Sequence, residues 1–194
     1  MEITKRNYEM ELHRMRDLPF QNVKEVVFHH SAGSVNSTAA GINHYHMNGR
    51  GWAGIAYHYI IRGSGEIQEG RPLDKEGVHA ARPANGESWA ICLLGNFENH
   101  PPTKEQYQSA QWLYWELKGM KGDITPSVHK DHMATLCPGK HFDLDKATAP
   151  LPVTNGTFYR VVTGSFKNRD NALNRVQELK NAGFDSFITT FKKD

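Results

Sequence analysis

The stretch Val26-Val27-Phe28-His29-His30-Ser31-Ala32 decides how this chain folds. Its apolar half predicts a buried strand over residues 23–29, and two imidazoles follow at the end of that strand. Ligands of α/β proteins gather at the carboxyl ends of strands. We therefore expect a sheet protein with a polar site at the point where this strand ends.

A second stretch, residues 127–139, reads Ser-Val-His-Lys-Asp-His-Met-Ala-Thr-Leu-Cys-Pro-Gly and places His129 eight residues before Cys137. One imidazole at the strand end, a second imidazole and a thiolate make three zinc ligands. Three ligands leave a fourth position for water, as in catalytic rather than structural zinc sites. No second C-x-x-C pair exists to complete a structural site. The pattern indicates metal-assisted hydrolysis.

Other histidines compete for these roles. His30 points to the opposite face if the strand continues, so we expect it to be a neighbour of the metal ligands rather than a ligand. His132 lies three residues after His129 and is an alternative ligand. His44 and His46 face different directions on a helix, which favours a surface position for both.

Strand and helix signals alternate along residues 1–149. This alternation predicts an α/β fold, with a central mixed β-sheet flanked by helices. The first twenty residues are polar and predict a short helical or irregular arm. We expect further strands at 56–61, 66–69, 89–94 and 124–128, a helix at 37–47 capped by Ser37, and a helix at 103–118 opened by the capping box Thr103–Gln106.

The C-terminal part forms a separate small unit. Residues 150–156, Pro-Leu-Pro-Val-Thr-Asn-Gly, are typical of a linker. After it we expect a strand at 157–165, a helix at 170–182 and a strand at 186–191. The chain therefore divides into a domain of residues 1–149 and a β-α-β unit of residues 157–194.

Composition excludes several classes of protein. The 194 residues are 38% hydrophobic and 23% charged, as in a globular protein, and a net charge of +2 gives no case for nucleic acid. No segment is apolar enough for membrane insertion. The two cysteines do not suggest a disulfide framework, and Cys92 lies in the apolar run Ile91-Cys92-Leu93-Leu94, which predicts a packed core thiol.

Five blocks of residues follow one another along the chain. They are Val27–Ala32, residues 57–61, residues 77–80, residues 91–95, and His129 with Cys137-Pro138. Together they resemble the zinc-dependent N-acetylmuramoyl-L-alanine amidases, the type 2 amidase family that includes phage amidase-type lysozymes and peptidoglycan recognition proteins. The resemblance covers roughly residues 22–148. It implies zinc bound by His29, His129 and Cys137, and cleavage of the amide between N-acetylmuramic acid and L-alanine in peptidoglycan.

The resemblance also implies roles around the metal. Tyr57 matches a tyrosine over the zinc, where a phenol stabilises the oxyanion of the tetrahedral intermediate. Thr135 occupies a position where some relatives carry lysine, so it offers only a hydroxyl to that oxyanion. Cys92 stands where the muropeptide-recycling branch of the family uses a glutamate base, which favours the lysozyme and recognition-protein branch.

Four residues are candidates for substrate binding. His79, Asn85 and Trp89 fall in the segment that borders the substrate groove in relatives, and Trp52 follows Gly49-Arg50-Gly51 and offers a ring to stack on a sugar. Packing of loops is the competing explanation for each of them.

The tail resembles a sporulation-related (SPOR-like) repeat, a module that binds peptidoglycan glycan. Such modules normally contain two β-α-β repeats, and this chain has one. A single two-stranded unit has too little core to be stable alone, so we expect a homodimer through the C-terminal repeat, with docking on the catalytic domain as the alternative.

Taken together, the sequence predicts a phage endolysin. The N-terminus has no apolar signal segment, so we expect synthesis in the cytoplasm without a signal peptide and action on the cell wall after release. Two alternatives are a non-catalytic peptidoglycan-binding receptor, against which Cys137 argues, and a cytoplasmic muropeptide-recycling amidase, against which the tail argues.

Overall fold

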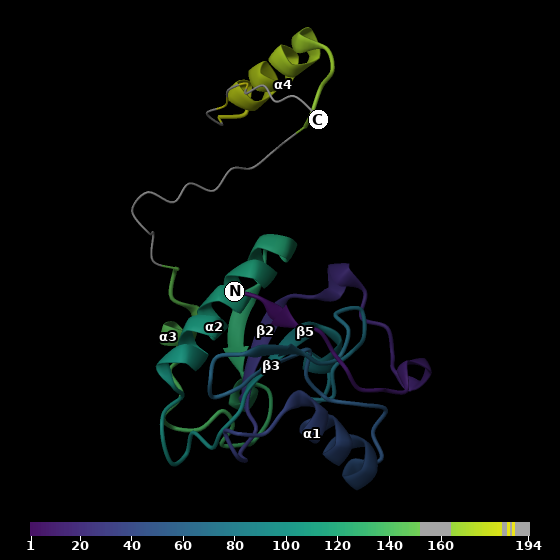
Figure 1. The fold of residues 1–194 in the computed structure, drawn as a ribbon, viewed down its shortest axis with the longest axis vertical. Helices are drawn as coiled ribbons and strands as arrows, with labels where there is room; N and C mark the ends of the chain where they lie inside the picture. The colour runs from purple at the N-terminus through teal and green to yellow at the C-terminus, as the bar shows by residue number, and fades with distance from the viewer. Residues whose placement is uncertain (152–163, 184–185, 187, 189–194) are drawn as a thin grey trace. The chain divides into compact units, whose positions relative to one another are not determined.

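The computed structural model describes residues 1–151, 164–183, 186 and 188. The chain divides into two compact units, Met1–Pro152 and Val153–Asp194. The first unit holds a six-stranded sheet with helices on both faces (Figure 1). The second unit contributes one described helix, α4. The predicted α/β class with a central mixed sheet is confirmed.

The strands of the sheet lie in the order β1-β4-β3-β5-β2-β6. Only β3 and β4 pair in an antiparallel sense, with Ile61 opposite Ile67, so the predicted hairpin is present. The strands are β1 (Ile3–Thr4), β2 (Glu25–His30), β3 (Tyr59–Ile61), β4 (Ile67–Glu69), β5 (Ser88–Leu93) and β6 (Thr125–Val128). The helices are α1 (Ala39–His44), α2 (Lys104–Lys121), α3 (Leu144–Thr148) and α4 (Arg169–Asn181). Short helical turns span Leu12–Arg14, Phe20–Asn22, Tyr45–Gly49, Ala84–Gly86 and His129–Asp131.

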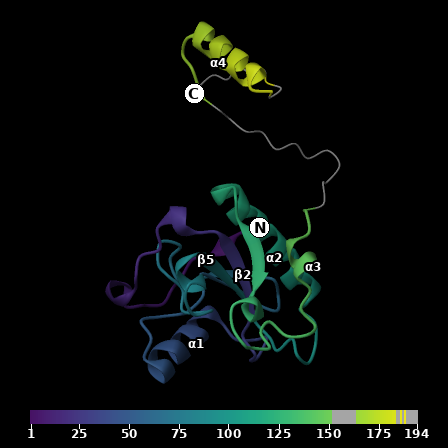
Figure 2. The ribbon, with the colours of Figure 1, turned by 180° about the vertical axis from the view of Figure 1, so that it is seen from behind.

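The two faces of the sheet carry different cores. Successive side chains of a strand point to opposite faces. Val26 and Phe28 of β2 belong to the larger core, which α2 and α3 cover. The smaller core lies on the α1 face and contains Cys92 with Ile60. Figures 1 and 2 show α2 and α3 together, away from α1. The predicted core position of Cys92 is confirmed, since this thiol is fully buried.

Helix α2 begins where the sequence predicts. The Thr103 hydroxyl accepts a hydrogen bond from the Gln106 amide, and the Gln106 side chain accepts one from the Thr103 amide. This capping box satisfies two amides that lack helical partners. The helix continues to Lys121, three residues beyond the predicted end, and stops at Gly122, whose φ is +82°.

Helix α1 is shorter than predicted, and its cap is Thr38 rather than Ser37. The Thr38 hydroxyl accepts from the Gly41 amide, and the chain passes from α1 into a π-helical turn at Tyr45–Gly49. The expected surface position of His46 is wrong. Its Nδ1 accepts a hydrogen bond from the Ala56 amide, and the ring is 7% exposed. This hydrogen bond holds the imidazole of His46 in the interior of the first unit.

The strand expected at 56–61 is also shorter, because the His58 side chain replaces a backbone carbonyl in one hydrogen bond to β5. The His58 side chain accepts the Ala90 amide of β5 through Nδ1, and its own amide donates to the Ala90 carbonyl. The regular strand then begins at Tyr59.

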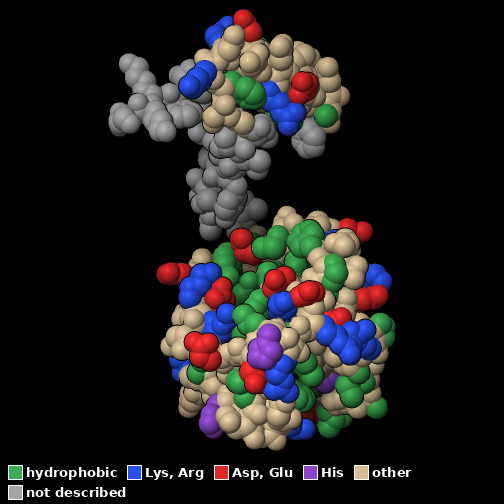
Figure 3. All heavy atoms as spheres, turned by 90° about the vertical axis from the view of Figure 1, so that its right-hand side faces the viewer, with side chains coloured by type: hydrophobic (Ala, Val, Ile, Leu, Met, Phe, Trp, Pro, Cys, Tyr) green, Lys and Arg blue, Asp and Glu red, His purple; other side chains and the backbone are tan. Residues whose placement is uncertain are grey.

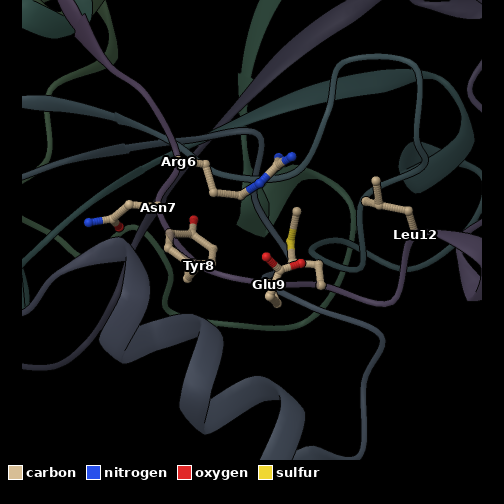
Figure 4. A pocket seen from close by; sticks show the side chains of 6 residues that line it. Arg6, Asn7, Tyr8, Glu9 and Leu12 are labelled. Carbon is tan, nitrogen blue, oxygen red and sulfur yellow. The ribbon is translucent and has the colours of Figure 1, made fainter.

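The N-terminal arm contributes an unpredicted strand, β1, which pairs in parallel with β4. Beyond it, the Tyr8 hydroxyl donates to the Glu69 carbonyl and Arg6 donates to the Gly70 carbonyl. Arg6, Tyr8 and Leu12 are among the residues of the arm that line a pocket (Figure 4). The arm covers an edge of β4 that would otherwise leave backbone groups unpaired.

In the second unit, α4 begins at Arg169 after the Asn168 side chain, which accepts from the Asp170 amide. Gly183, with φ of +85°, follows its end as predicted. The strands expected at 157–165 and 186–191 lie largely outside the described residues.

The surface is mixed in charge. On the face of the first unit in Figure 3, acidic and basic side chains are interspersed. Within the described part of the chain, no helix is long and apolar enough to cross a bilayer.

Gly139 provides a test of the loop that carries Cys137. Its φ is +99°, and an added Cβ would lie 2.4 Å from the carbonyl carbon of Phe97 and 2.7 Å from the Glu98 amide nitrogen. We predict that Gly139→Ala lowers the free energy of unfolding by about 1–3 kcal/mol in urea titrations. As a control, Gly119→Ala in α2 meets open space and raises it by about 0.5–1 kcal/mol. Equal effects at the two sites would contradict the analysis.

Candidate metal centre

Two histidines meet at the carboxyl ends of neighbouring parallel strands. The register of β2 and β6 places Phe28 opposite Val128, and the next residues are His29 and His129. Their ring centroids lie 4.6 Å apart. His29 faces away from the larger core, on the same side of the sheet as its β5 partner Cys92. Pairing of the strands alone therefore brings the two imidazoles together.

Cys137 completes the group from the loop that follows β6. The Lys130 amide donates to the Cys137 carbonyl at 3.0 Å, which closes this loop. The thiol sulfur Sγ lies 3.7 Å from Nδ1 of His29, and the His30 amide points at it from 3.4 Å. The ligand atoms of His29, His129 and Cys137 all lie within 4.8 Å of one another. The described residues form no other such group of three.

These three residues fit a tetrahedral metal. Zinc bonds of roughly 2.3 Å to sulfur and roughly 2.0–2.1 Å to nitrogen place the two ligand atoms about 3.6 Å apart. The distance between His29 Nδ1 and Cys137 Sγ is 3.7 Å. Nε2 of His129 is buried without a hydrogen-bond partner. A buried polar atom without a partner costs free energy, which a metal bond at this nitrogen would remove.

Burial sets the charge of the group. It lowers the pKa of His29 well below its usual value, with the other nearby histidines adding to the effect, and it also lowers the pKa of His129. Both imidazoles are therefore neutral and offer lone pairs. Burial raises the pKa of Cys137 to about 11, against a smaller lowering by the His30 amide. Metal binding must therefore release the thiol proton.

The other predicted competitors occupy different positions. Nδ1 of His30 accepts a hydrogen bond from the Phe97 amide at 3.1 Å. His132 contacts the Ser127 hydroxyl at 3.1 Å and Glu25 at 3.3 Å through Nε2. Neither belongs to the group of three. His132 instead ties the loop after β6 back to the first residue of β2.

Tyr57 lies beside the ligands. Its ring centroid is 5.1 Å from that of His29, and the phenol is partly buried between β3 and α1. Burial raises the pKa of Tyr57 well above its usual value, and the thiols of Cys92 and Cys137 raise it further. The phenol therefore keeps its proton and acts as a hydrogen-bond donor.

Thr135 is placed by the same loop as Cys137. Its hydroxyl oxygen accepts from the Cys137 amide at 3.2 Å, which leaves the hydroxyl proton free to donate. The side chain is partly exposed.

The four predicted substrate residues separate into three environments. Trp89 is 1% exposed in the larger core and donates to the Leu73 carbonyl, so its predicted place at the groove is wrong. Successive side chains of a strand point to opposite faces of the sheet. Ala90 and Cys92 of β5 face the metal side, so the Trp89 side chain points to the α2 face. His79 is also buried, with Nδ1 3.0 Å from Nε2 of His29.

Trp52 and Asn85 line one pocket with several arginines. The Trp52 ring packs 4.8 Å from His46, and the Arg50 guanidinium lies 5.9 Å from its centre. Asn85 accepts the amides of His79 and Ala80 through Oδ1. The arginines of this pocket are Arg14, Arg16, Arg71 and Arg82.

Two features of the site are not predicted from the sequence: the position of Arg71 and the direct contact between His29 and His79. Arg71 is 4% exposed, and its guanidinium donates to the carbonyls of Gly54, Ile55 and Glu76. It holds the segment before Tyr57. No pattern in the sequence marks it, since a charged residue in a loop is ordinarily exposed.

Comparison with known proteins gives a consistent picture. Residues 19–140 match the model of the N-acetylmuramoyl-L-alanine amidase family, and residues 144–190 match that of the SPOR domain, which starts within α3. Peptidoglycan recognition protein 1 of Bos indicus is 32% identical over 130 residues, 61% of this chain and 68% of that protein. Peptidoglycan-recognition protein SC2 of Drosophila melanogaster is 35% identical over 124 residues, 58% of this chain and 66% of that protein.

Solved structures agree. The amidase LysC from Clostridium intestinale URNW has a TM-score of 0.68 and 32% identity, covering 77% of this chain and 96% of that one. The endolysin of Thermus scotoductus bacteriophage Ph2119 has a TM-score of 0.61 and 25% identity, covering 72% of this chain and 92% of that one.

The family model covers more than half of the chain and spans every residue of the metal centre. The expectation of an enzyme of this class and of a SPOR-like tail is confirmed. This chain belongs to the N-acetylmuramoyl-L-alanine amidase family.

Proposed function

We propose that this chain is a zinc-dependent peptidoglycan hydrolase that cleaves the amide between N-acetylmuramic acid and L-alanine of the stem peptide. The observation that carries the proposal is the group of His29, His129 and Cys137, with its fit to tetrahedral zinc. Three protein ligands leave a position for water, as a hydrolytic site requires. Bound zinc supplies an activated water molecule and polarises the scissile carbonyl.

The side chains around the metal centre stabilise the oxyanion and contact the substrate. The Tyr57 phenol, protonated because of its burial, donates a hydrogen bond to the oxyanion that develops on the carbonyl oxygen. The Thr135 hydroxyl, whose oxygen accepts from the Cys137 amide, is a second donor, and a weaker one because its side chain is partly exposed to solvent. Trp52 and Asn85, on the wall of one pocket, are the candidates for contact with the substrate. His79 serves the metal ligand rather than the substrate.

A non-catalytic receptor is the alternative within this family, and several relatives carry the name of peptidoglycan recognition protein. A receptor needs no thiolate ligand. Cys137 is nevertheless present, buried and directed at His29. The complete set of ligands favours the hydrolase over the receptor.

An endolysin is the specific role that we propose. Solved structures of an endolysin amidase from Clostridium intestinale URNW and of the Ph2119 phage endolysin match over more than 90% of their own length. The SPOR match at residues 144–190 suits binding to the wall, which a recycling enzyme acting on small muropeptides does not need. In this role the protein is made in the cytoplasm and acts on the wall after release.

Mass spectrometry of fragments released from purified cell walls tests the reaction. We expect free stem peptides with an L-alanine amino terminus, and glycan strands that lack peptides but have gained no new reducing ends. New reducing ends without free peptides would contradict the proposed bond. Heat-denatured protein serves as the blank.

The metal can be tested by substitution. We predict about one zinc per chain by elemental analysis, and loss of zinc and activity in Cys137→Ser, because serine does not supply a thiolate. Cys92→Ala removes the other buried thiol, which lies outside the group of ligands, and retains zinc. Full zinc content in Cys137→Ser would contradict the assignment of Cys137 as a zinc ligand.

The two oxyanion donors should contribute unequally to kcat. We predict that Tyr57→Phe lowers kcat on soluble muropeptide by on the order of a hundredfold without loss of zinc, because it removes one donor to the developing charge. Thr135→Ala should cost less, because this hydroxyl is partly exposed and water can replace part of its contribution. A larger loss at Thr135 than at Tyr57 would reverse the assignment.

We also propose a homodimer through the C-terminal unit. In its described part, Phe166, Leu173 and Ile188 are each more than one-third exposed, with relative exposures of 46%, 39% and 37%. A small unit with these apolar side chains at its surface gains stability from a partner. Sedimentation should show a dimer for the full chain and a monomer for a chain ending at Leu151. A monomeric full chain at micromolar concentration rejects the dimer.

A further inference from the structure

We propose that His79 is a positioning residue for the metal centre. A chain of hydrogen bonds that starts at the Ala84 carbonyl and passes through Ser88 and His79 fixes His29 in the tautomer that presents Nδ1 to the metal. This inference rests on the proposed zinc site and adds a residue that acts through a ligand rather than on the substrate.

The chain is anchored at its outer end by a group that can only accept. The Ser88 hydroxyl lies 2.6 Å from the Ala84 carbonyl oxygen, and Ser88 is fully buried. A hydroxyl has one proton, and a carbonyl has none to give. Ser88 therefore donates to Ala84 and can only accept from any other neighbour.

His79 is that neighbour. Its Nε2 lies 3.4 Å from the Ser88 oxygen, a long hydrogen bond in which the imidazole must be the donor. A neutral imidazole with a proton on Nε2 has a lone pair on Nδ1. This Nδ1 lies 3.0 Å from Nε2 of His29. His29 must then donate through Nε2.

The last link fixes the metal ligand. With its proton on Nε2, His29 has an unprotonated Nδ1, and this is the atom that lies 3.7 Å from the Cys137 sulfur. His29 is 0% exposed, so no solvent competes for either nitrogen. The opposite tautomer would leave His29 Nε2 and His79 Nδ1 as two acceptors facing each other. It would also put a proton where the metal bonds.

The surroundings hold His79 in place. Its amide and that of Ala80 both donate to Oδ1 of Asn85 at 2.9 Å. Gly77 leaves room for the ring, since a Cβ there would lie 2.2 Å from Cδ2 of His79. Metal-bound histidines usually donate their second nitrogen to a carboxylate, a carbonyl or water, and such partners typically contribute 10–100-fold in metal affinity. Here the acceptor is an imidazole, which orients His29 without adding charge.

His58 offers a matched control. It is 1% exposed and its ring lies 6.3 Å from that of His79. Its Nε2 bonds the Lys75 carbonyl and its Nδ1 accepts the Ala90 amide, so it takes no part in the chain to His29. Loss of His58 should disturb packing as much as loss of His79 does, without changing the tautomer of His29.

The first experiment needs no substitution. Long-range ¹H–¹⁵N spectra of the zinc-free protein report which imidazole nitrogen carries the proton. We expect both His29 and His79 as the Nε2–H tautomer. A His29 with its proton on Nδ1 would overturn the proposal.

The second experiment measures zinc affinity by competition with a chelator. We expect His79→Leu to bind zinc about 10–100-fold more weakly, and His79→Asn to recover most of that loss, because an amide oxygen can accept near the position of Nδ1. His58→Leu, the same substitution at the control site, should bind zinc like the wild type. Equal losses in His79→Leu and His58→Leu would show a general packing effect and reject the proposal.

Two outcomes separate this inference from the proposed function. If the wild type binds no zinc, the zinc hydrolase is wrong whatever the tautomers are. If the wild type binds zinc and His79→Leu binds it equally well, only the role of His79 fails. Should His79→Leu not fold, Ser88→Ala replaces it. Its spectra should show His79 as a mixture of tautomers, and an unchanged single tautomer would count against the chain.

Discussion

The parallel pairing of β2 with both β5 and β6 is the constraint on which the site depends. Phe28 lies opposite Val128, and the residues that follow are His29 and His129, the two imidazoles of the proposed metal site. A slip of one residue would turn His29 toward the larger core and Phe28 toward the metal side, since the two faces alternate along a strand. The buried apolar residues of β2 oppose that slip, because it would remove Val26 and Phe28 from the larger core on the α2 face. Packing of the larger core therefore fixes the geometry of the metal centre on the other face.

The same alternation separates stability from chemistry along β5. Trp89, Ile91 and Leu93 fill the core beneath α2, whereas Cys92 lies on the α1 face next to His29. Helix α2 stabilises the sheet without touching the site, and the segments around α1 supply Tyr57 and the residues that pack beside it. Substitutions beneath α2 should accordingly change stability before they change the metal centre.

Local signals made much of this structure predictable from the sequence. The apolar run before His29, the capping box at Thr103 and the turn between β3 and β4 each identified an element within a few residues. The order of His29, His129 and Cys137, through a family resemblance, predicted the three residues that the structure brings together. The alternation of side chains along β5 also predicts the position of Trp89. It places this ring on the same face as Ile91 and Leu93, and therefore in the core.

Other features depend on contacts between distant segments, which no local pattern records. The arm forms β1 only because β4 presents a free edge. His46 is buried because the Ala56 amide, ten residues away, donates to it. The position of His79 behind His29 joins residues fifty apart in the chain. A polar side chain in a predicted loop gives no sign of such a partner, and so the sequence alone predicts a contact of His79 with the substrate.

The histidines near the metal centre show how the fold prepares the site. His30, His58 and His79 are all buried, burial lowers the pKa of each, and each has a hydrogen-bond partner on a ring nitrogen. Among the described residues, the only buried side-chain nitrogens or oxygens without a partner are Nε of Arg62 and Nε2 of His129. Unpaired buried polar groups are rare because they cost free energy. The fold therefore satisfies the imidazoles that surround the centre and leaves Nε2 of His129 unpaired, as the proposed metal site requires of a ligand atom.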